Sequence, residues 1–269
     1  MSTQIHPTAV VHPSARLGDG AVIGPFCVVE EDVVIGDGTV LDAHVIIGKR
    51  TRLGCGNRLF PNCVIGKPPQ ILGTNDQTPI GGLTIGDHNV IREFVTIHPS
   101  MHPEEQTVVG SQNLLMIGVH LGHDCLLEDK IVISNYTQVS GHCKIETGVW
   151  LSGLVAIHQF CTVGKWCYAA GYTGINHDVP PFVIISGHYP HEVRALNKRG
   201  MTRAGLSEEQ KAALFEAFKF IWRSDKPVLS QVHLLAEQDG LEEPVKALVE
   251  SLLNSSRQRF GRYRELFRD

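Results

Sequence analysis

Residues 17–35 read Leu17-Gly-Asp-Gly-Ala-Val-Ile23-Gly-Pro-Phe-Cys-Val-Val29-Glu-Glu-Asp-Val-Val-Ile35, with an aliphatic residue at every sixth position. The same register runs from Ile5 to Ile65, resumes from Ile85 to Ile97, and continues from Val109 to Ile175. A period of six fits neither one face of a helix nor the simple alternation of a strand. It is typical of a parallel β-helix, in which each hexad forms a short strand and a corner, and three hexads form one coil.

The cysteines support this register. A small or medium-sized residue follows each aliphatic position by four residues, and we expect it to point inward. Cysteine is a small residue that is often buried, so we interpret the six cysteines at this position as core residues rather than metal ligands. Their odd total and the lack of C-x-x-C pairs argue against a disulfide framework. The six are Cys27, Cys63, Cys125, Cys143, Cys161 and Cys167, whereas Cys55 is out of register.

Two interruptions and a polar tail organise the rest of the chain. Residues 67–82 and 98–107 break the repeat, and we expect both to leave the coil as loops. The hexads end at Val179-Pro180-Pro181, because proline cannot donate to a strand ladder. Ser207-Glu-Glu-Gln210 has the form of a capping box and precedes apolar residues at helical spacing. We therefore predict a mainly β fold, with a β-helix over residues 1–187 and a connecting segment and C-terminal helical domain over 188–269.

Composition limits the possible partners. With 42% hydrophobic and 19% charged residues and a formal net charge of -4, the sequence predicts a globular protein and gives no case for nucleic-acid binding. The first 15 residues lack a basic and an apolar region, and no run approaches the roughly 18 apolar residues of a membrane span. We expect a cytoplasmic protein without a transmembrane segment.

The hexad Leu121-Gly-His-Asp-Cys-Leu126 carries an imidazole and a carboxylate where other hexads carry turn residues. Residues 18 apart should stack at the ~4.8 Å spacing of neighbouring strands. Three successive coils then bring together one polar patch: His120, His123, Asp124, Gly141, His142, His158 and Gln159.

This patch suits proton transfer. A neutral imidazole is the side chain best matched to proton abstraction near pH 7, so His123 is the candidate general base, with Asp124 orienting it. Gly141 can offer a backbone N–H to a developing oxyanion. Direct transfer is the simplest mechanism, although Ser140 lies close enough to be considered as a nucleophile.

Two other interpretations stay open at this point. His120, His123 and His142 have the composition of a catalytic zinc site with an open position for water, and some hexapeptide-repeat proteins are metal-dependent hydratases. The corner histidines also fit a purely structural stack.

Four motifs resemble those of the LpxA family of UDP-N-acetylglucosamine O-acyltransferases. They are Asn113-Leu-Leu-Met-Ile-Gly-Val-His-Leu-Gly-His-Asp-Cys125, Ile91-Arg-Glu-Phe-Val-Thr-Ile-His98, Ala156-Ile-His-Gln-Phe-Cys161 and His177-Asp-Val-Pro-Pro181. The likeness covers nearly the whole chain. It implies a left-handed β-helix that forms a homotrimer, with active sites between subunits. It also implies transfer of a 3-hydroxyacyl chain from acyl carrier protein to the 3-hydroxyl of UDP-N-acetylglucosamine, the first step of lipid A synthesis.

The resemblance also implies residue roles. His123 would be the general base, without a covalent intermediate, beside Asp124, and Gly141 would supply the oxyanion N–H. The acyl chain would arrive on the phosphopantetheine arm of acyl carrier protein, with no other cofactor and no metal. Gly171 would line the acyl groove, and the basic residues would meet nucleotide phosphates or the acidic carrier, unless they form only a solvated turn. The implied substrate-binding residues are Gln70, His120, His142, His158, Gln159, Gly171, Lys198, Arg199 and Arg203.

Two segments depart from the family pattern. Where the family usually has Gln-Asp-Leu-Lys, this chain has Gln70-Ile-Leu-Gly73, and the connection before Lys198 is shorter and reads His191-Glu-Val-Arg-Ala-Leu196. Both segments handle donor and sugar nucleotide in the family. A relative that acylates another UDP-sugar, including one with an amine acceptor, is therefore a second interpretation.

Overall fold

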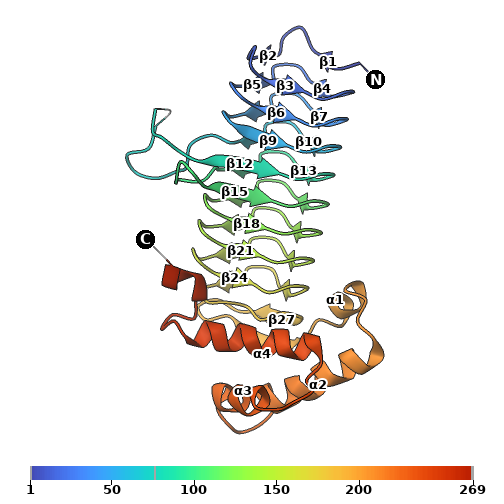
Figure 1. Ribbon diagram of the computed structural model, residues 1–269, viewed down its shortest axis with the longest axis vertical. Helices are drawn as coiled ribbons and strands as arrows, with labels where there is room; N and C mark the ends of the chain where they lie inside the picture. The colour runs from blue at the N-terminus through green and yellow to red at the C-terminus, as the bar shows by residue number, and fades with distance from the viewer. Residues whose placement is uncertain (1, 76, 268–269) are drawn as a thin grey trace.

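The computed structural model describes residues 2–75 and 77–267. Residues 1, 76, 268 and 269 lie outside the described part, and with them the outer limits of both predicted domains and one position of the first predicted loop. The chain forms a tapering column of stacked coils with helices packed at one end (Figure 1). This is the parallel β-helix that the period of six predicts.

Three parallel sheets form the sides of the column, and each coil contributes one strand to each sheet. Sheet A contains β1 (Gln4–Ile5), β4 (Val22–Ile23), β7 (Val40–Leu41), β10 (Arg58–Leu59), β13 (Val90–Ile91), β16 (Leu114–Leu115), β19 (Val132–Ile133), β22 (Trp150–Leu151), β25 (Tyr168–Ala169), β27 (Val183–Ser186) and β28 (Glu192–Leu196). Sheet B contains β2 (Val10–Val11), β5 (Val28–Val29), β8 (Ile46–Ile47), β11 (Val64–Ile65), β14 (Thr96–Ile97), β17 (His120–Leu121), β20 (Gln138–Val139), β23 (Ala156–Ile157) and β26 (Gly174–Ile175). Sheet C contains β3 (Arg16–Leu17), β6 (Val34–Ile35), β9 (Thr51–Leu53), β12 (Gly82–Ile85), β15 (Gln106–Val109), β18 (Leu126–Leu127), β21 (Lys144–Ile145) and β24 (Thr162–Val163).

The register follows the sequence arithmetic around the histidine corner. Leu121 pairs with Val139, and Val139 pairs with Ile157, so successive coils are 18 residues apart. The second residue of each pair points inward, and these three side chains are buried in one continuous core. The six in-register cysteines are buried and Cys55 is exposed, as predicted.

Both interruptions leave the column on the same side. Residues 66–81 connect β11 to β12 and project outward (Figure 1), and residues 98–105 connect β14 to β15. Because of the second insertion, Thr96 pairs with His120 and the coil interval there is 24 residues instead of 18.

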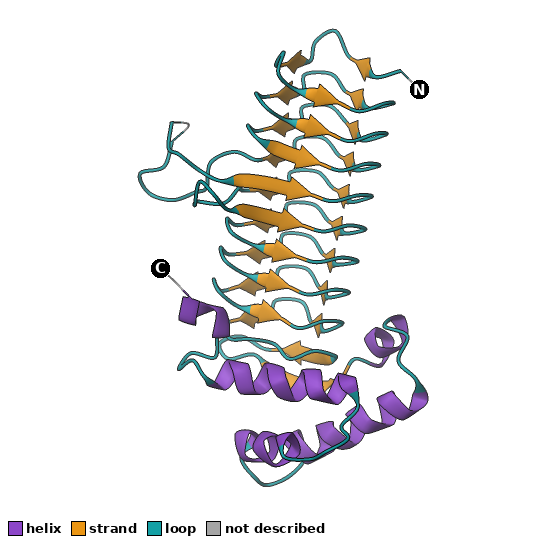
Figure 2. Cartoon of the chain, viewed as in Figure 1, coloured by secondary structure: helices purple, strands orange, loops and turns teal. Residues whose placement is uncertain are grey.

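The column ends in an antiparallel turn and a helical cap. β27 extends sheet A, and β28 returns antiparallel beside it, so the predicted boundary at 187/188 falls within this turn. The helices are α1 (Lys198–Arg203), α2 (Glu208–Trp222), α3 (Val228–Ala236) and α4 (Glu243–Ser256), followed by the 3-10 helix η1 (Tyr263–Phe267) (Figure 2). The capping box at Ser207 and Gln210 is present at the start of α2. Within residues 2–75 and 77–267, no helix has the length and apolar character needed to cross a membrane.

Candidate active site

A histidine and an aspartate form a hydrogen-bonded pair at the corner between sheets B and C. His123 Nδ1 lies 2.6 Å from Asp124 Oδ2. An ionised carboxylate only accepts hydrogen bonds, so this contact places the proton on Nδ1 and leaves Nε2 as the basic nitrogen. Adjacent residues can meet in this way because Asp124 has φ 59°, in the left-handed region that aspartate tolerates better than most residues.

The Asp124 carboxylate is buried but remains the favoured anion. Burial raises its pKa, yet hydrogen bonds from His123 and Ser100 and the nearby His142 outweigh burial and leave the pKa below its usual value. His142 Nε2 lies 3.7 Å from Asp124 Oδ2. The His142 ring stacks on Phe160 at 4.4 Å, and its pKa is lowered by burial. The corner therefore offers one anchored base and one neutral imidazole beside it.

The second inserted loop holds the carboxylate from below. Ser100 Oγ donates a short hydrogen bond to Asp124 Oδ1, and the Met101 N–H lies 3.3 Å from the same oxygen. Thr107 Oγ1 accepts from the Asp124 N–H at 2.8 Å. The side chain of Asp124 thus contacts His123 on one side and the loop on the other.

Gly141 lies directly above the His123 ring, as the coil arithmetic predicts. A Cβ at Gly141 would stand 2.6 Å from His123 Cε1 and 2.7 Å from Nε2, so only glycine leaves room for this ring. The coils are joined here by the His142 N–H, which donates to His123 O at 2.9 Å. At the same turn position in other coils, the N–H of Lys49 donates to the carboxylate of Glu30, nineteen residues earlier. The residue nineteen before Gly141 is Gly122, which has no side chain to cover the Gly141 N–H.

A second imidazole pair lies on the outer face of sheet B. His120 Nδ1 lies 2.9 Å from Thr96 Oγ1, and the His120 ring meets the His98 ring edge-on at 5.2 Å. Burial lowers the pKa of His120 to about 4, and it also lowers the pKa of His98. His98 Nδ1 contacts Lys67 O, while its buried Nε2 has no hydrogen-bond partner among the described residues. Both rings are thus neutral groups beside the corner.

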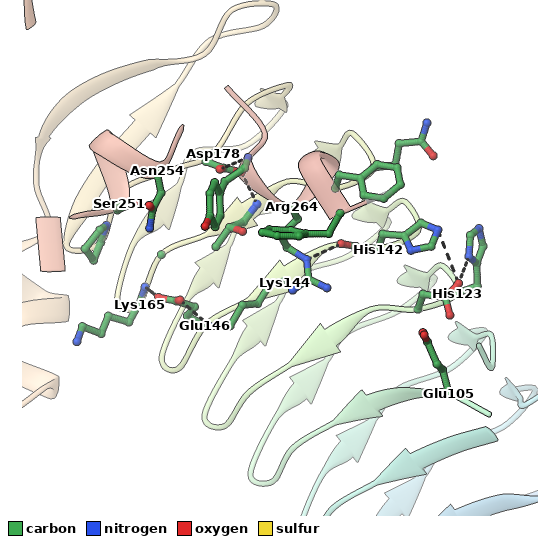
Figure 3. Close-up of a pocket in the computed structure, with 18 of the residues that line it drawn as sticks. Glu105, His123, His142, Lys144, Glu146, Lys165, Asp178, Ser251, Asn254 and Arg264 are labelled. Atoms are coloured by element: carbon green, nitrogen blue, oxygen red, sulfur yellow. Dashed lines mark hydrogen bonds and ion pairs between the residues drawn. The ribbon is translucent and has the colours of Figure 1, made fainter. Parts of the chain in front are cut away.

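A groove extends from the corner along sheet C toward the helical cap. His123 and His142 lie at one end, and Lys165, Ser251 and Asn254 lie at the other (Figure 3). η1 closes one side, where Arg264 Nε donates to His142 O at 3.0 Å. Gln159 also lines the groove, whereas His158 Nδ1 contacts the Gln159 carbonyl at 3.0 Å.

The donors close enough to hold a metal ion differ from the predicted three imidazoles. Among the described residues they are His123, Asp124 and His142, and a second set of His102, Glu105 and Asp124. His120 belongs to neither set, because its Nδ1 is turned toward Thr96. The predicted zinc triad is therefore not assembled in this chain.

The remaining predicted residues lie elsewhere in this single chain. Gly171 is exposed at the corner between sheets A and B, where a Cβ would meet only Gly153 O at 3.5 Å. Lys198, Arg199 and Arg203 are exposed on α1, where Arg203 lies over Trp150 of sheet A. Gln70 is exposed in the first loop, although its neighbour Ile71 lines the groove. None of these five residues contacts the His123 corner of its own chain.

Three residues near the corner escape the sequence interpretation. They are His98, Ser100 and His102, all from the second loop or its first residue. The 24-residue interval hides them, because counting in steps of 18 does not reach them. A usable signal existed for His98, which follows Ile97 as His158 follows Ile157 in the same hexad register.

Comparisons with known proteins agree with this geometry. A family model described as "Udp N-acetylglucosamine O-acyltransferase; Domain 2" matches residues 178–260. Relatives named acyl-[acyl-carrier-protein]--UDP-N-acetylglucosamine O-acyltransferase include one from Ectopseudomonas mendocina, 42% identical over 257 residues, covering 95% of this chain and 98% of the relative. One from Gloeothece citriformis is 41% identical over 141 residues, and that match spans about half (51%) of the relative's length. The solved UDP-N-acetylglucosamine acyltransferase of Francisella novicida superposes with a TM-score of 0.88 at 33% identity, covering 96% of this chain and 93% of that one.

Proposed function

Because the chain belongs to the UDP-N-acetylglucosamine O-acyltransferase family, we propose that it transfers an acyl chain from acyl carrier protein to the 3-hydroxyl of UDP-N-acetylglucosamine. The donor would be a (3-hydroxy)acyl thioester on the phosphopantetheine arm, and the reaction would begin lipid A synthesis. The observation that carries the proposal is the His123–Asp124 pair at 2.6 Å, with Gly141 against the imidazole.

The proposed chemistry needs one base and one oxyanion donor. His123 Nε2 takes the proton of the acceptor hydroxyl, and the resulting alkoxide oxygen attacks the thioester carbonyl carbon. The Gly141 N–H donates to the oxyanion of the tetrahedral intermediate. When the C–S bond breaks, the imidazolium returns its proton to the leaving thiolate. Asp124 stabilises the imidazolium during this cycle, and no covalent acyl-enzyme forms.

An exposed apolar surface supports a ring of three copies. Sheets A and B carry outward-facing valine, leucine and isoleucine side chains, including Val10, which is 64% exposed. The corner between these sheets bears Phe26, Phe94, Tyr136 and Tyr172, all exposed and all with positive φ. Contiguous exposed apolar surface marks a protein interface. Two different faces of each copy in contact form a heterologous interface, which closes into a ring such as a trimer.

In such a ring, sheet A of one copy would face sheet B of the next. Gly171 and α1 lie on the sheet A side, and His120 lies on sheet B beside the catalytic corner. We therefore propose that Lys198, Arg199 and Arg203 contact substrate at the neighbour's His123.

Mixing two inactive variants tests this arrangement. His123→Ala and Arg203→Ala proteins, unfolded and refolded together, should regain about a quarter of parental activity, because a site needs one intact residue from each of two neighbours. Each variant refolded alone is the control. No recovery from mixtures that form trimers would contradict a shared site.

A substrate comparison tests the activity itself. Purified protein should acylate UDP-N-acetylglucosamine with acyl carrier protein thioesters of several chain lengths, and treatment with a chelator should leave the rate unchanged. Preference for a UDP-sugar with a 3-amine would instead identify the related amine acyltransferase. Activity that requires added zinc would point to the metal-dependent alternative.

A further inference from the structure

The second inserted loop places one serine hydroxyl on the carboxylate of the catalytic pair. Ser100 is fully buried, and its Oγ donates a short hydrogen bond to Asp124 Oδ1. The other carboxylate oxygen, Oδ2, contacts His123 Nδ1 at 2.6 Å. The serine and the histidine therefore hold opposite oxygens of one carboxylate.

The backbone fixes this hydroxyl in place. The Ser100 N–H donates to Gly82 O at 3.1 Å, and Ser100 O accepts from the Gly81 N–H at 2.9 Å, so the residue is tied to the start of β12 on both sides. Ser100 Oγ also accepts from the His102 N–H at 3.0 Å. With these bonds made, the hydroxyl proton has the Asp124 carboxylate as its closest acceptor.

We propose that Ser100 is a positioning residue, whose hydroxyl holds the Asp124 carboxylate in the orientation that aligns His123. This inference rests on the proposed function, in which His123 is the base. Ser100 would touch neither substrate nor the reacting atoms. It would act only through Asp124, and that restriction makes the proposal testable.

Thr107 provides a matched comparison. Like Ser100 it is fully buried and hydrogen-bonds Asp124, but its Oγ1 contacts the backbone N–H of that residue at 2.8 Å. Removing the Thr107 hydroxyl therefore disturbs Asp124 without touching the carboxylate, and this contact persists whatever side chain stands at 124.

A double-mutant cycle separates positioning from general structural support. The experiment measures kcat and KM for acyl transfer by the full-length chain with Ser100→Ala, Asp124→Ala and both together. Loss of a hydrogen bond to a charged group should lower kcat roughly tenfold in the single Ser100→Ala variant, with KM unchanged. In the Asp124→Ala background the same substitution should change kcat less than about twofold, because no carboxylate remains to be held.

The controls make each outcome decisive. Thr107→Val should lower kcat by the same factor in both backgrounds, because its contact is to the backbone. Ser100→Cys, which keeps the side chain but donates only weakly, replaces Ser100→Ala in the cycle if the alanine variant does not fold. Equal losses from Ser100→Ala in both backgrounds, or a single variant as active as the parent, would overturn the inference. An inactive parent, or an active His123→Ala variant, would instead refute the proposed function.

Discussion

Replacing Gly141 with alanine should disable the base while leaving the fold in place. The added Cβ would stand 2.6 Å from His123 Cε1 and 2.7 Å from Nε2, whereas carbon atoms in ordinary contact are ~3.5–4.0 Å apart. The ring must therefore move by about 1 Å, and its 2.6 Å contact with Asp124 cannot survive unchanged. A displacement of about 1 Å from reactive geometry costs on the order of 10²-fold in rate.

The cost in stability should be smaller than the cost in rate. Overpacking of a core costs ~1–3 kcal/mol, but the His123 side chain is 17% exposed and can swing toward the groove. We expect Gly141→Ala to lower kcat about a hundredfold and to lower the free energy of unfolding by no more than about 1 kcal/mol. Initial rates of acyl transfer and urea denaturation measure the two quantities.

Gly153→Ala is the matched control. Gly153 occupies the equivalent turn position at another corner, and an added Cβ there meets only Asn135 O at 3.5 Å. This variant should retain the parental rate. If Gly141→Ala turns over as fast as the parent, or if both variants lose rate equally, the packing argument for His123 is refuted.

Three further predictions concern protonation and packing. His191, stacked on His177 at 3.7 Å, has its pKa lowered by burial to about 3, so the fold should lose stability as pH falls below the unfolded histidine value of about 6.5. His191→Phe should therefore reduce the loss of unfolding free energy between pH 7 and 4 by about 2 kcal/mol; an unchanged pH dependence in urea titrations would contradict this. Because burial raises the pKa of the in-register thiols such as Cys63 (to about 12), a thiol reagent should label Cys55 rapidly in the native protein and the other six only after unfolding; fast labelling of several thiols would show that the core is open. Thr96→Val should weaken acceptor binding several-fold by freeing the His120 ring, worth about 1 kcal/mol for one hydrogen bond, and an unchanged KM for the UDP-sugar would argue against a role for His120.

The fold could be predicted because the hexad is a local signal repeated many times. Each inward residue is fixed by its own six-residue unit, so Leu121, Val139 and Ile157 stack without any long-range information. The capping box at Ser207 gave the start of α2 for the same reason. By contrast, β28 and η1 have no such repeat. The contact from Arg264 to His142 joins residues 122 positions apart, and nothing local in the sequence indicates it.

The site was predictable only where the coils are regular. Steps of 18 residues place Gly141 over His123 and His142 near Asp124, as the structure shows. The inserted loop changes the interval to 24, so Ser100 could not be assigned to the carboxylate it holds. Residues inferred from the family likeness, such as Gly171 and Arg203, lie on another face of the chain, because their proposed role depends on a neighbouring copy.

The rate of acyl transfer by His123→Ala tests the proposed mechanism most directly. The assay combines purified parent or variant with acyl carrier protein thioester and UDP-N-acetylglucosamine at saturating concentrations. General-base catalysis by a positioned side chain contributes ~10²–10⁴-fold, so kcat should fall by that factor while the melting temperature and oligomeric state stay unchanged. A variant with kcat within a few-fold of the parent would contradict the assignment of His123 as the base.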